Sequence, residues 1–92
     1  MKKQSTVVPI GKKDARTIEL IFYSPLKRFV TQDRQMLALN GANSVRDIIV
    51  AQGVPSEQLF YTMVLVNERK VPLATIVRDG DRVEVFQPIG GG

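Results

Sequence analysis

One short amphipathic helix, expected over residues 44–52, constrains the fold more than any other feature of this sequence. Val45, Ile48 and Ile49 lie at the i, i+3 and i+4 positions that form one apolar stripe along a helix. Strand-like alternation and turn signals occupy most of the remaining chain. A helix of about two turns covers one face of a small sheet and little more. The sequence therefore predicts one α+β domain, with one main helix on a mixed sheet of about four or five strands.

The two ends of this helix carry recognisable signals. Ser44 is a suitable N-cap, and Asp47 follows three residues later, close to a capping box. Gly53 is placed to close the helix in the left-handed backbone conformation, and Pro55 prevents the helix from resuming. Because β-branched residues lower the intrinsic helicity, packing on the sheet must supply much of the stability.

Alternation of apolar and polar residues predicts the strands. In the first strand, over residues 17–23, Ile18, Leu20 and Phe22 share one face. The opposite face is also partly apolar because it carries Tyr23. The later strands are expected over residues 33–40, 62–66, 70–71 and 82–86.

The segments after the first strand and around the third strand carry further expectations. We expect residues 26–30 to form a loop or a short extended piece. Leu59 and Phe60 are expected to plug the end of the core. The strand over residues 62–66 is expected to be buried on both faces, because nearly all of its residues are apolar.

The residue types restrict the chemistry that the chain can perform by itself. It contains no histidine and no cysteine, which removes the commonest general base, the thiol nucleophile and most transition-metal sites. Asp79 and Asp81 flank Gly80, an arrangement more typical of a turn than of a metal or acid–base site. We therefore expect a protein that is not an enzyme and that binds no cofactor or metal of its own.

The net charge of +4 is concentrated at the N-terminus. The basic residues there are Lys2, Lys3, Lys12, Lys13 and Arg16, with Asp14 as the one acidic residue. We interpret residues 1–16 as a basic, flexible extension that precedes a domain over residues 17–87 and a flexible tail over residues 88–92. A basic arm can also bind nucleic acid or an acidic partner. The chain lacks the interleaved aromatic and basic residues of a base-stacking platform, so we do not expect nucleic acid as a partner.

The expected location is the cytoplasm. No apolar run is long enough to span a bilayer, so we expect no membrane contact. The apolar segment near the N-terminus is too short for an export signal and is interrupted by Pro9. The lack of cysteine fits this location.

The end of the chain is an uncharged tail that closes with three glycines. Glycines carry no side chain that would collide with the walls of a narrow channel. With histidine and cysteine absent, the carboxylate of Gly92 is the remaining reactive group. Delivered into a partner's site, it can attack the α-phosphate of ATP, and a sulfur donor can then displace AMP to leave a thiocarboxylate. A frayed end without function is the alternative interpretation of the glycines taken alone.

Phe86 is the candidate docking contact next to this tail. The strand alternation places it on the outward side together with Glu84, while Val83 and Val85 point inward. An exposed aromatic residue beside a functional tail suits a partner interface. A position at the rim of the protein's own core explains Phe86 equally well.

Residues 77–92 resemble a known C-terminal signature. They read Val-x-Asp-Gly-Asp-x-Val-Glu-Val-Phe-x-Pro-Ile-x-Gly-Gly, as in the ThiS/MoaD family of ubiquitin-like sulfur-carrier proteins. This family includes the thiamine-biosynthesis sulfur carrier and the small subunit of molybdopterin synthase. Val66-Asn67 and Val71-Pro72 resemble a hairpin of the same family, and residues 18–23 resemble the opening strand of its molybdopterin type. The similarity covers about residues 17–92.

The resemblance implies a β-grasp fold in which the first and last strands form a central parallel pair. It also implies that Gly92 is adenylated, with Gly91 as its required neighbour, and that Pro88, Ile89 and Gly90 thread into the partner. The implied partners are a ubiquitin-activating-type adenylyltransferase, which uses ATP, and a persulfide as sulfur donor. The thiocarboxylate is then consumed by thiazole synthase or by the large subunit of molybdopterin synthase.

Some residues depart from the family pattern and leave the pathway open. The basic extension is not part of the minimal family, and Asn67-Glu68 stands where Asn-Gly is common. The first strand favours the molybdopterin pathway, whereas the triple glycine favours the thiamine pathway. Two other functions remain as alternatives: a ubiquitin-like protein modifier, and a β-grasp interaction module that never uses its terminus.

Overall fold

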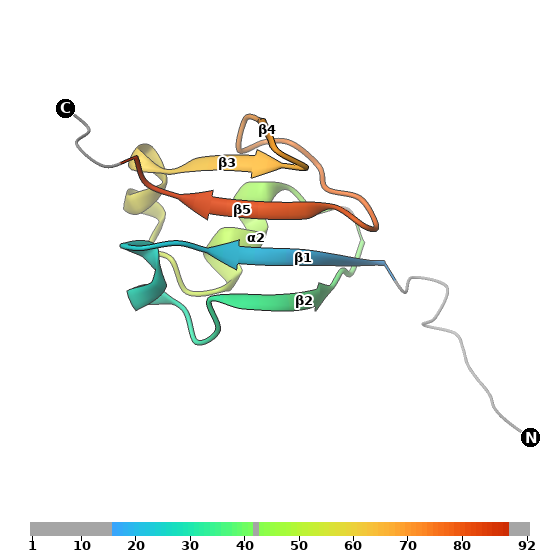
Figure 1. Ribbon diagram of the computed structural model, residues 1–92, viewed down its shortest axis with the longest axis horizontal. Helices are drawn as coiled ribbons and strands as arrows, with labels where there is room; N and C mark the ends of the chain where they lie inside the picture. The colour runs from blue at the N-terminus through green and yellow to red at the C-terminus, as the bar shows by residue number, and fades with distance from the viewer. Residues whose placement is uncertain (1–15, 42, 89–92) are drawn as a thin grey trace, which may run out of the picture.

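The computed structural model describes residues 16–41 and 43–88, in which one α-helix packs on one mixed sheet (Figure 1). In chain order the strands are β1 (Thr17–Phe22), β2 (Arg34–Ala38), β3 (Met63–Val66), β4 (Arg69–Lys70) and β5 (Arg82–Phe86). The helices are α2 (Val45–Ala51) and the short 3-10 helices η2 (Leu26–Phe29) and η3 (Ser56–Tyr61). The sheet has five strands in the order β2-β1-β5-β3-β4. The predicted α+β class with one main helix is confirmed.

The first and last strands, β1 and β5, form a parallel pair at the centre of the sheet (Figure 1). In their register Leu20 lies beside Val83 and Phe22 beside Val85, and all four side chains are almost fully buried. The pairs β1–β2, β3–β4 and β3–β5 are antiparallel. The resemblance implied a central parallel pair, and the observed register confirms it.

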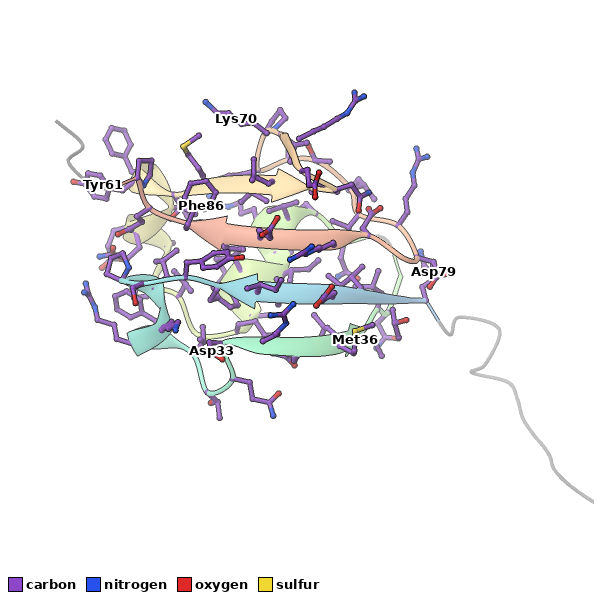
Figure 2. The ribbon with its side chains drawn as sticks, viewed as in Figure 1. Asp33, Met36, Tyr61, Lys70, Asp79 and Phe86 are labelled. Atoms are coloured by element: carbon purple, nitrogen blue, oxygen red, sulfur yellow. The ribbon has the colours of Figure 1, made fainter. Side chains whose placement is uncertain are left out.

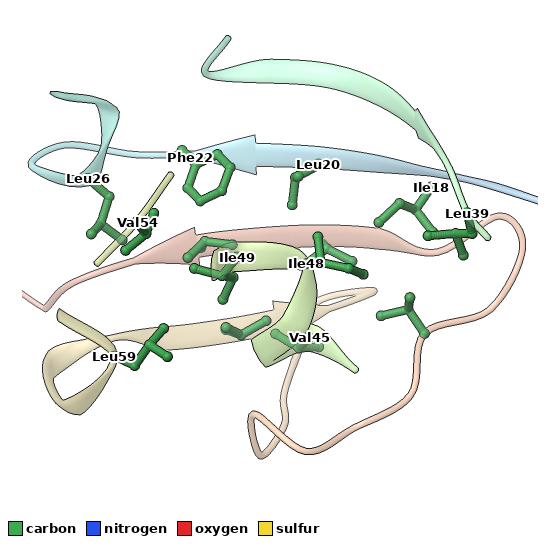
Figure 3. Close-up of a cluster of buried hydrophobic side chains, with 14 residues drawn as sticks. Ile18, Leu20, Phe22, Leu26, Leu39, Val45, Ile48, Ile49, Val54 and Leu59 are labelled. Atoms are coloured by element: carbon green, nitrogen blue, oxygen red, sulfur yellow. The ribbon is translucent and has the colours of Figure 1, made fainter. Parts of the chain in front are cut away.

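Helix α2 covers one face of the sheet (Figure 3). The Asp47 backbone N–H donates a hydrogen bond to the Ser44 hydroxyl oxygen at 3.1 Å, so the predicted N-cap is confirmed. Val45, Ile48 and Ile49 are buried, as the apolar stripe predicts. The remaining members of the core cluster are Ile18, Leu20, Phe22, Leu26, Leu39, Val54, Leu59, Val64, Val77, Val83 and Val85.

The turn before β5 is held by its two aspartates. The Thr17 backbone N–H donates to a carboxylate oxygen of Asp79 at 2.9 Å, which ties this turn to the start of β1. Asp81 accepts from the Arg78 backbone N–H at 2.8 Å and from the Asn67 side-chain amide at 2.9 Å. The prediction that this segment serves as a turn is confirmed, because both carboxylates accept hydrogen bonds that fix the local backbone.

Leu59 and Phe60 of η3 are both expected to plug the end of the core, but only one of them is buried. Leu59 is buried in the core, as predicted. The prediction for Phe60 is wrong, because its side chain is 87% exposed. Adjacent residues of a 3-10 helix point in different directions, so when Leu59 faces the core Phe60 faces outward.

The expectations for residues 26–30 and for the burial of β3 are also wrong. Residues 26–30 contain the 3-10 helix η2, which is anchored in the core by the fully buried Leu26. Within β3, Val64 is buried, whereas Met63 and Leu65 are half-buried. Their side of the sheet is the one opposite α2, so among the described residues no helix covers it.

Residues 1–15, most of the predicted basic extension, lie outside the described residues. In the part of the chain that is described, no helix has the length and apolar character needed to cross a membrane.

Replacing Gly53 with alanine is expected to destabilise the fold strongly. Gly53 follows α2 with a φ of +114°, and an added Cβ would lie 2.6 Å from the backbone carbonyl oxygen of Phe29. The substitution adds backbone strain and a collision with main chain that cannot rotate away. We expect the free energy of unfolding to fall by roughly 3 kcal/mol, measured by urea denaturation.

Gly41→Ala is the matched control for this substitution. Gly41 also has a positive φ, +75°, but its added Cβ would meet nothing within 4 Å. This variant carries the conformational cost alone, roughly 1 kcal/mol. Equal losses in the two variants would contradict the proposed collision with Phe29.

Candidate functional site

The predicted tail begins where β5 ends. Phe86 is the last residue of β5, followed by the half-buried Gln87 and the exposed Pro88, at which the described residues end. The predicted threading and adenylation residues beyond it, which are Ile89, Gly90, Gly91 and Gly92, lie outside the described residues. The candidate site is therefore built from the segments that surround the start of the tail.

A mainly apolar groove of about 470 Å³ lies beside the start of the tail, on the face of the sheet opposite α2. It is lined by Tyr23, Ser24, Leu65, Glu84, Phe86, Gln87 and Pro88. The rings of Tyr23 and Phe86 pack edge to face with their centres 6.4 Å apart. Phe86 is half-buried in this groove and is not part of the core cluster, so its predicted outward placement is confirmed.

Tyr23 and Glu84 form the polar contact of this groove. The Tyr23 hydroxyl donates a hydrogen bond to a carboxylate oxygen of Glu84 at 2.7 Å, between residues 61 positions apart in the chain. This hydrogen bond is the main cause of the raised pKa of Tyr23, with burial and the charge of Glu84 adding to it. Tyr23 therefore stays a neutral donor at physiological pH, and the pair orients the ring that walls the groove.

A row of alternating charges continues across the same face, away from the groove. Arg34 on β2 pairs with Glu19 on β1 at 3.0 Å, and Arg82 on β5 lies 3.8 Å from both Glu19 and Glu84. Such partly exposed pairs contribute little to stability, each about 1 kcal/mol or less. The outer face is thus divided into an apolar part beside the tail and a charged part farther along the strands.

A second aromatic feature lies at the same end of the sheet. Phe60 and Tyr61 of η3 are 87% and 62% exposed, and their rings pack edge to face with centres 5.2 Å apart. Tyr61 and Phe86 lie toward one end of the strands, whereas Asp79 lies at the opposite end (Figure 2). The start of the tail is therefore flanked by apolar groups on two sides.

Sequence reasoning found Phe86 and Pro88 but did not single out the other groove residues. The alternation along β1 placed Tyr23 on the outer face, which was the available signal for it. Leu65 could not be assigned to the site, because the pairing of β3 with β5 sets its position. Its neighbours in space are far away in the sequence.

The side chains that line the groove suit the recognition of a partner. Among residues 16–41 and 43–88, no group of three or more carboxylates, histidines or cysteines is arranged to hold a metal ion. The titratable groups of the groove, Tyr23 and Glu84, are hydrogen-bonded to each other. An apolar groove with one fixed polar pair is typical of a surface that binds a partner.

Comparisons with known proteins agree with this architecture. The family model described as the ThiS family matches residues 20–92. SAMP1 from Haloferax volcanii has a crystal structure with 18% identity and a TM-score of 0.61, covering 83% of this chain and 99% of that one. A putative molybdopterin converting factor, subunit 1, from Pyrococcus furiosus has 21% identity and a TM-score of 0.62, covering 80% and 99%. No curated protein matches the sequence significantly.

The family match covers most of the chain. It begins within β1 and includes every later element of the sheet, as well as Gly91 and Gly92. The two solved structures share the β-grasp arrangement over most of this chain and nearly all of their own length. This protein therefore belongs to the ThiS family, with a ubiquitin-like β-grasp fold.

Proposed function

We propose that this protein is a sulfur carrier whose Gly92 carboxylate becomes a thiocarboxylate. The observation that carries the proposal is the ThiS family match, which extends through the terminal Gly91-Gly92 pair. The lack of histidine and cysteine supports it, because the tail carboxylate is then the one plausible reactive group of the chain. In this role the protein is a substrate that other enzymes modify, and it is not itself an enzyme.

The proposed chemistry takes place on the carboxylate in two stages. A carboxylate oxygen of Gly92 attacks the α-phosphorus of ATP in the activating enzyme, and pyrophosphate leaves. The terminal sulfur of a donor persulfide then attacks the acyl carbon, and AMP leaves. A second thiol breaks the resulting sulfur–sulfur bond, becomes part of a disulfide and releases the thiocarboxylate. ATP thus belongs to the partner's site and is not a cofactor of this chain.

The consuming enzyme is a synthase of cofactor biosynthesis, either thiazole synthase or the large subunit of molybdopterin synthase. Similarity to a putative molybdopterin converting factor favours the second, whereas the name of the family model favours the first. The cytoplasm is the proposed location, since activating enzyme, ATP and synthase must meet the carrier in one compartment.

A ubiquitin-like protein modifier is the second candidate function. Similarity to a second crystal structure from Haloferax volcanii, described as small archaeal modifier protein 1, supports it, with 17% identity and a TM-score of 0.61. A modifier passes the same activated carboxylate to a lysine amine instead of to sulfur. The two functions therefore share their first step and differ in the group that displaces AMP.

The groove beside the tail is the proposed docking surface for the activating enzyme. Tyr23, Leu65 and Phe86 present apolar area next to Pro88, so a partner bound there meets the tail at its origin. In this arrangement Pro88, Ile89 and Gly90 thread into the partner, and Gly92 arrives at the ATP site. Apolar and aromatic groups of this kind supply most of the binding free energy in protein interfaces.

The carrier function predicts a specific change in the mass of the protein. Incubation with the activating enzyme of the source organism, ATP and a persulfide donor is expected to replace one oxygen of the Gly92 carboxylate by sulfur. Intact-mass spectrometry measures this exchange, and omission of ATP is the control. A protein that stays unmodified with every activating enzyme of that organism would count against the proposal, and adducts on lysines of other proteins would favour the modifier.

Gly91→Ala is expected to slow adenylation roughly 100-fold, because a Cβ beside the carboxylate displaces it from its reactive geometry in a narrow channel. The free energy of unfolding is expected to stay unchanged, since residue 91 lies beyond the last strand. The measurement is ATP-dependent pyrophosphate release, with urea denaturation as the control. Release at the wild-type rate would refute the channel argument.

Phe86→Ala is expected to weaken binding to the activating enzyme about tenfold or more, because it removes the largest apolar group at the tail origin. Met36→Ala is the matched control: Met36 is 66% exposed and pairs with Glu19, away from the groove. Titration calorimetry gives the two dissociation constants. Equal weakening by both substitutions would exclude the groove as the docking surface.

A further inference from the structure

The first residue after β5 is anchored by a side-chain amide pair. The Gln87 side-chain amide donates a hydrogen bond to the side-chain oxygen of Gln58 at 3.0 Å, and the Gln58 backbone carbonyl oxygen lies 3.4 Å away. Both glutamines are half-buried. The pair joins the end of β5 to η3 across 29 positions of the chain.

Gln58 is itself fixed in place by hydrogen bonds within and after η3. The Thr62 hydroxyl donates to the Gln58 carbonyl oxygen at 2.8 Å, and the Thr62 backbone N–H donates to the Leu59 carbonyl at 3.1 Å. Leu59 is buried in the core. Gln87 is therefore attached to a segment that is fixed to the rest of the fold, and not to a mobile surface side chain.

Pro88 adds a second restriction at the same point. A proline has a fixed φ, and it also restricts the backbone of the residue before it to extended conformations. The amide pair holds the Gln87 side chain, while Pro88 limits the Gln87 backbone. Together they define the direction in which the chain leaves the sheet.

The amide pair is not what holds β5 in the sheet. β5 is already paired on both sides close to its end, through Phe22 with Val85 and through Met63 with Phe86. Residues beyond the last strand of a domain usually fray unless something ties them down. Ordering Gln87 in the free protein removes part of the entropy that would otherwise be lost when a partner captures the tail.

We propose that Gln87 is a positioning residue that directs the tail toward the partner's active site. The inference rests on the proposed function, since the tail must be the reacting segment. Gln87 acts through the geometry of Pro88 and the residues after it and does not touch the reacting atoms. A partner docked on the sheet then meets a chain whose exit from β5 is already set at Gln87 and Pro88.

The test compares Gln87→Ala with Gln35→Ala. Gln35 forms an equivalent half-buried amide pair, 3.0 Å from Gln52, but it belongs to β2 and not to the groove. Loss of one such hydrogen bond is expected to reduce the unfolding midpoint similarly in both variants. We expect kcat of adenylation to fall about tenfold for Gln87→Ala, with a smaller change in KM, because the apolar groups that dominate docking remain but the carboxylate is misplaced. Gln35→Ala is expected to keep the wild-type kcat.

Two further variants separate the hydrogen bond from packing. Gln87→Met keeps the length of the side chain but removes both its amide donor and its amide acceptor, so it is expected to lose activity as Gln87→Ala does. Gln58→Ala combined with Gln87→Ala is expected to be no slower than Gln87→Ala alone, because the two residues act as one pair. An unchanged kcat in Gln87→Ala, or an equal loss in Gln35→Ala, would overturn the positioning role.

An NMR measurement on the free protein tests the positioning role of Gln87 separately from the proposed function. NMR order parameters of the Gln87 and Ile89 amides are expected to decrease in Gln87→Ala and to remain unchanged in Gln35→Ala. If the wild-type protein is not adenylated at all, the proposed function fails, and the order parameters decide whether Gln87 directs the tail. Unchanged order parameters in Gln87→Ala would overturn the inference by themselves.

Discussion

The parallel pairing of β1 with β5 is the contact on which the rest of this structure depends. β2 joins the sheet through β1, and β3 and β4 join it through β5, so the two central strands hold both halves together. Leu20, Phe22, Val83 and Val85 give this pair its buried face, on which the stripe of α2 packs. Because the two strands lie far apart in the sequence, their pairing is a long-range contact whose formation carries a large loop-closure cost.

The same pairing creates the candidate site. Tyr23 directly follows β1, whereas Leu65 belongs to β3 and Phe86 to β5, and the three residues become a groove only in the observed register. The hydrogen bond from Tyr23 to Glu84 then links the end of β1 to β5 on the face opposite the core. One face of the sheet thus stabilises the fold, while the other holds the groups proposed to meet a partner at the origin of the tail.

Local patterns in the sequence predicted the elements well, because those patterns depend on nearby residues. The stripe of α2 and its Ser44 cap were predicted from spacing alone. Phe60 was placed wrongly, since an apolar pair does not reveal which member a 3-10 helix turns inward. The hydrogen bond between Gln58 and Gln87 joins residues that are distant in the sequence, so no short sequence motif predicts it. The family pattern at the end of the chain was recognisable from the sequence, and the family match covers it within residues 20–92.

The direction of the central pair also separates the two ends of the described domain. Because β1 and β5 run the same way, the chain enters the sheet at Thr17 at one end and leaves it after Phe86 at the other (Figure 1). A label, affinity tag or solid support joined directly to the start of β1 is therefore at the end of the sheet away from the groove. The domain can be immobilised through that end to capture the enzymes that act on its tail, without blocking their approach.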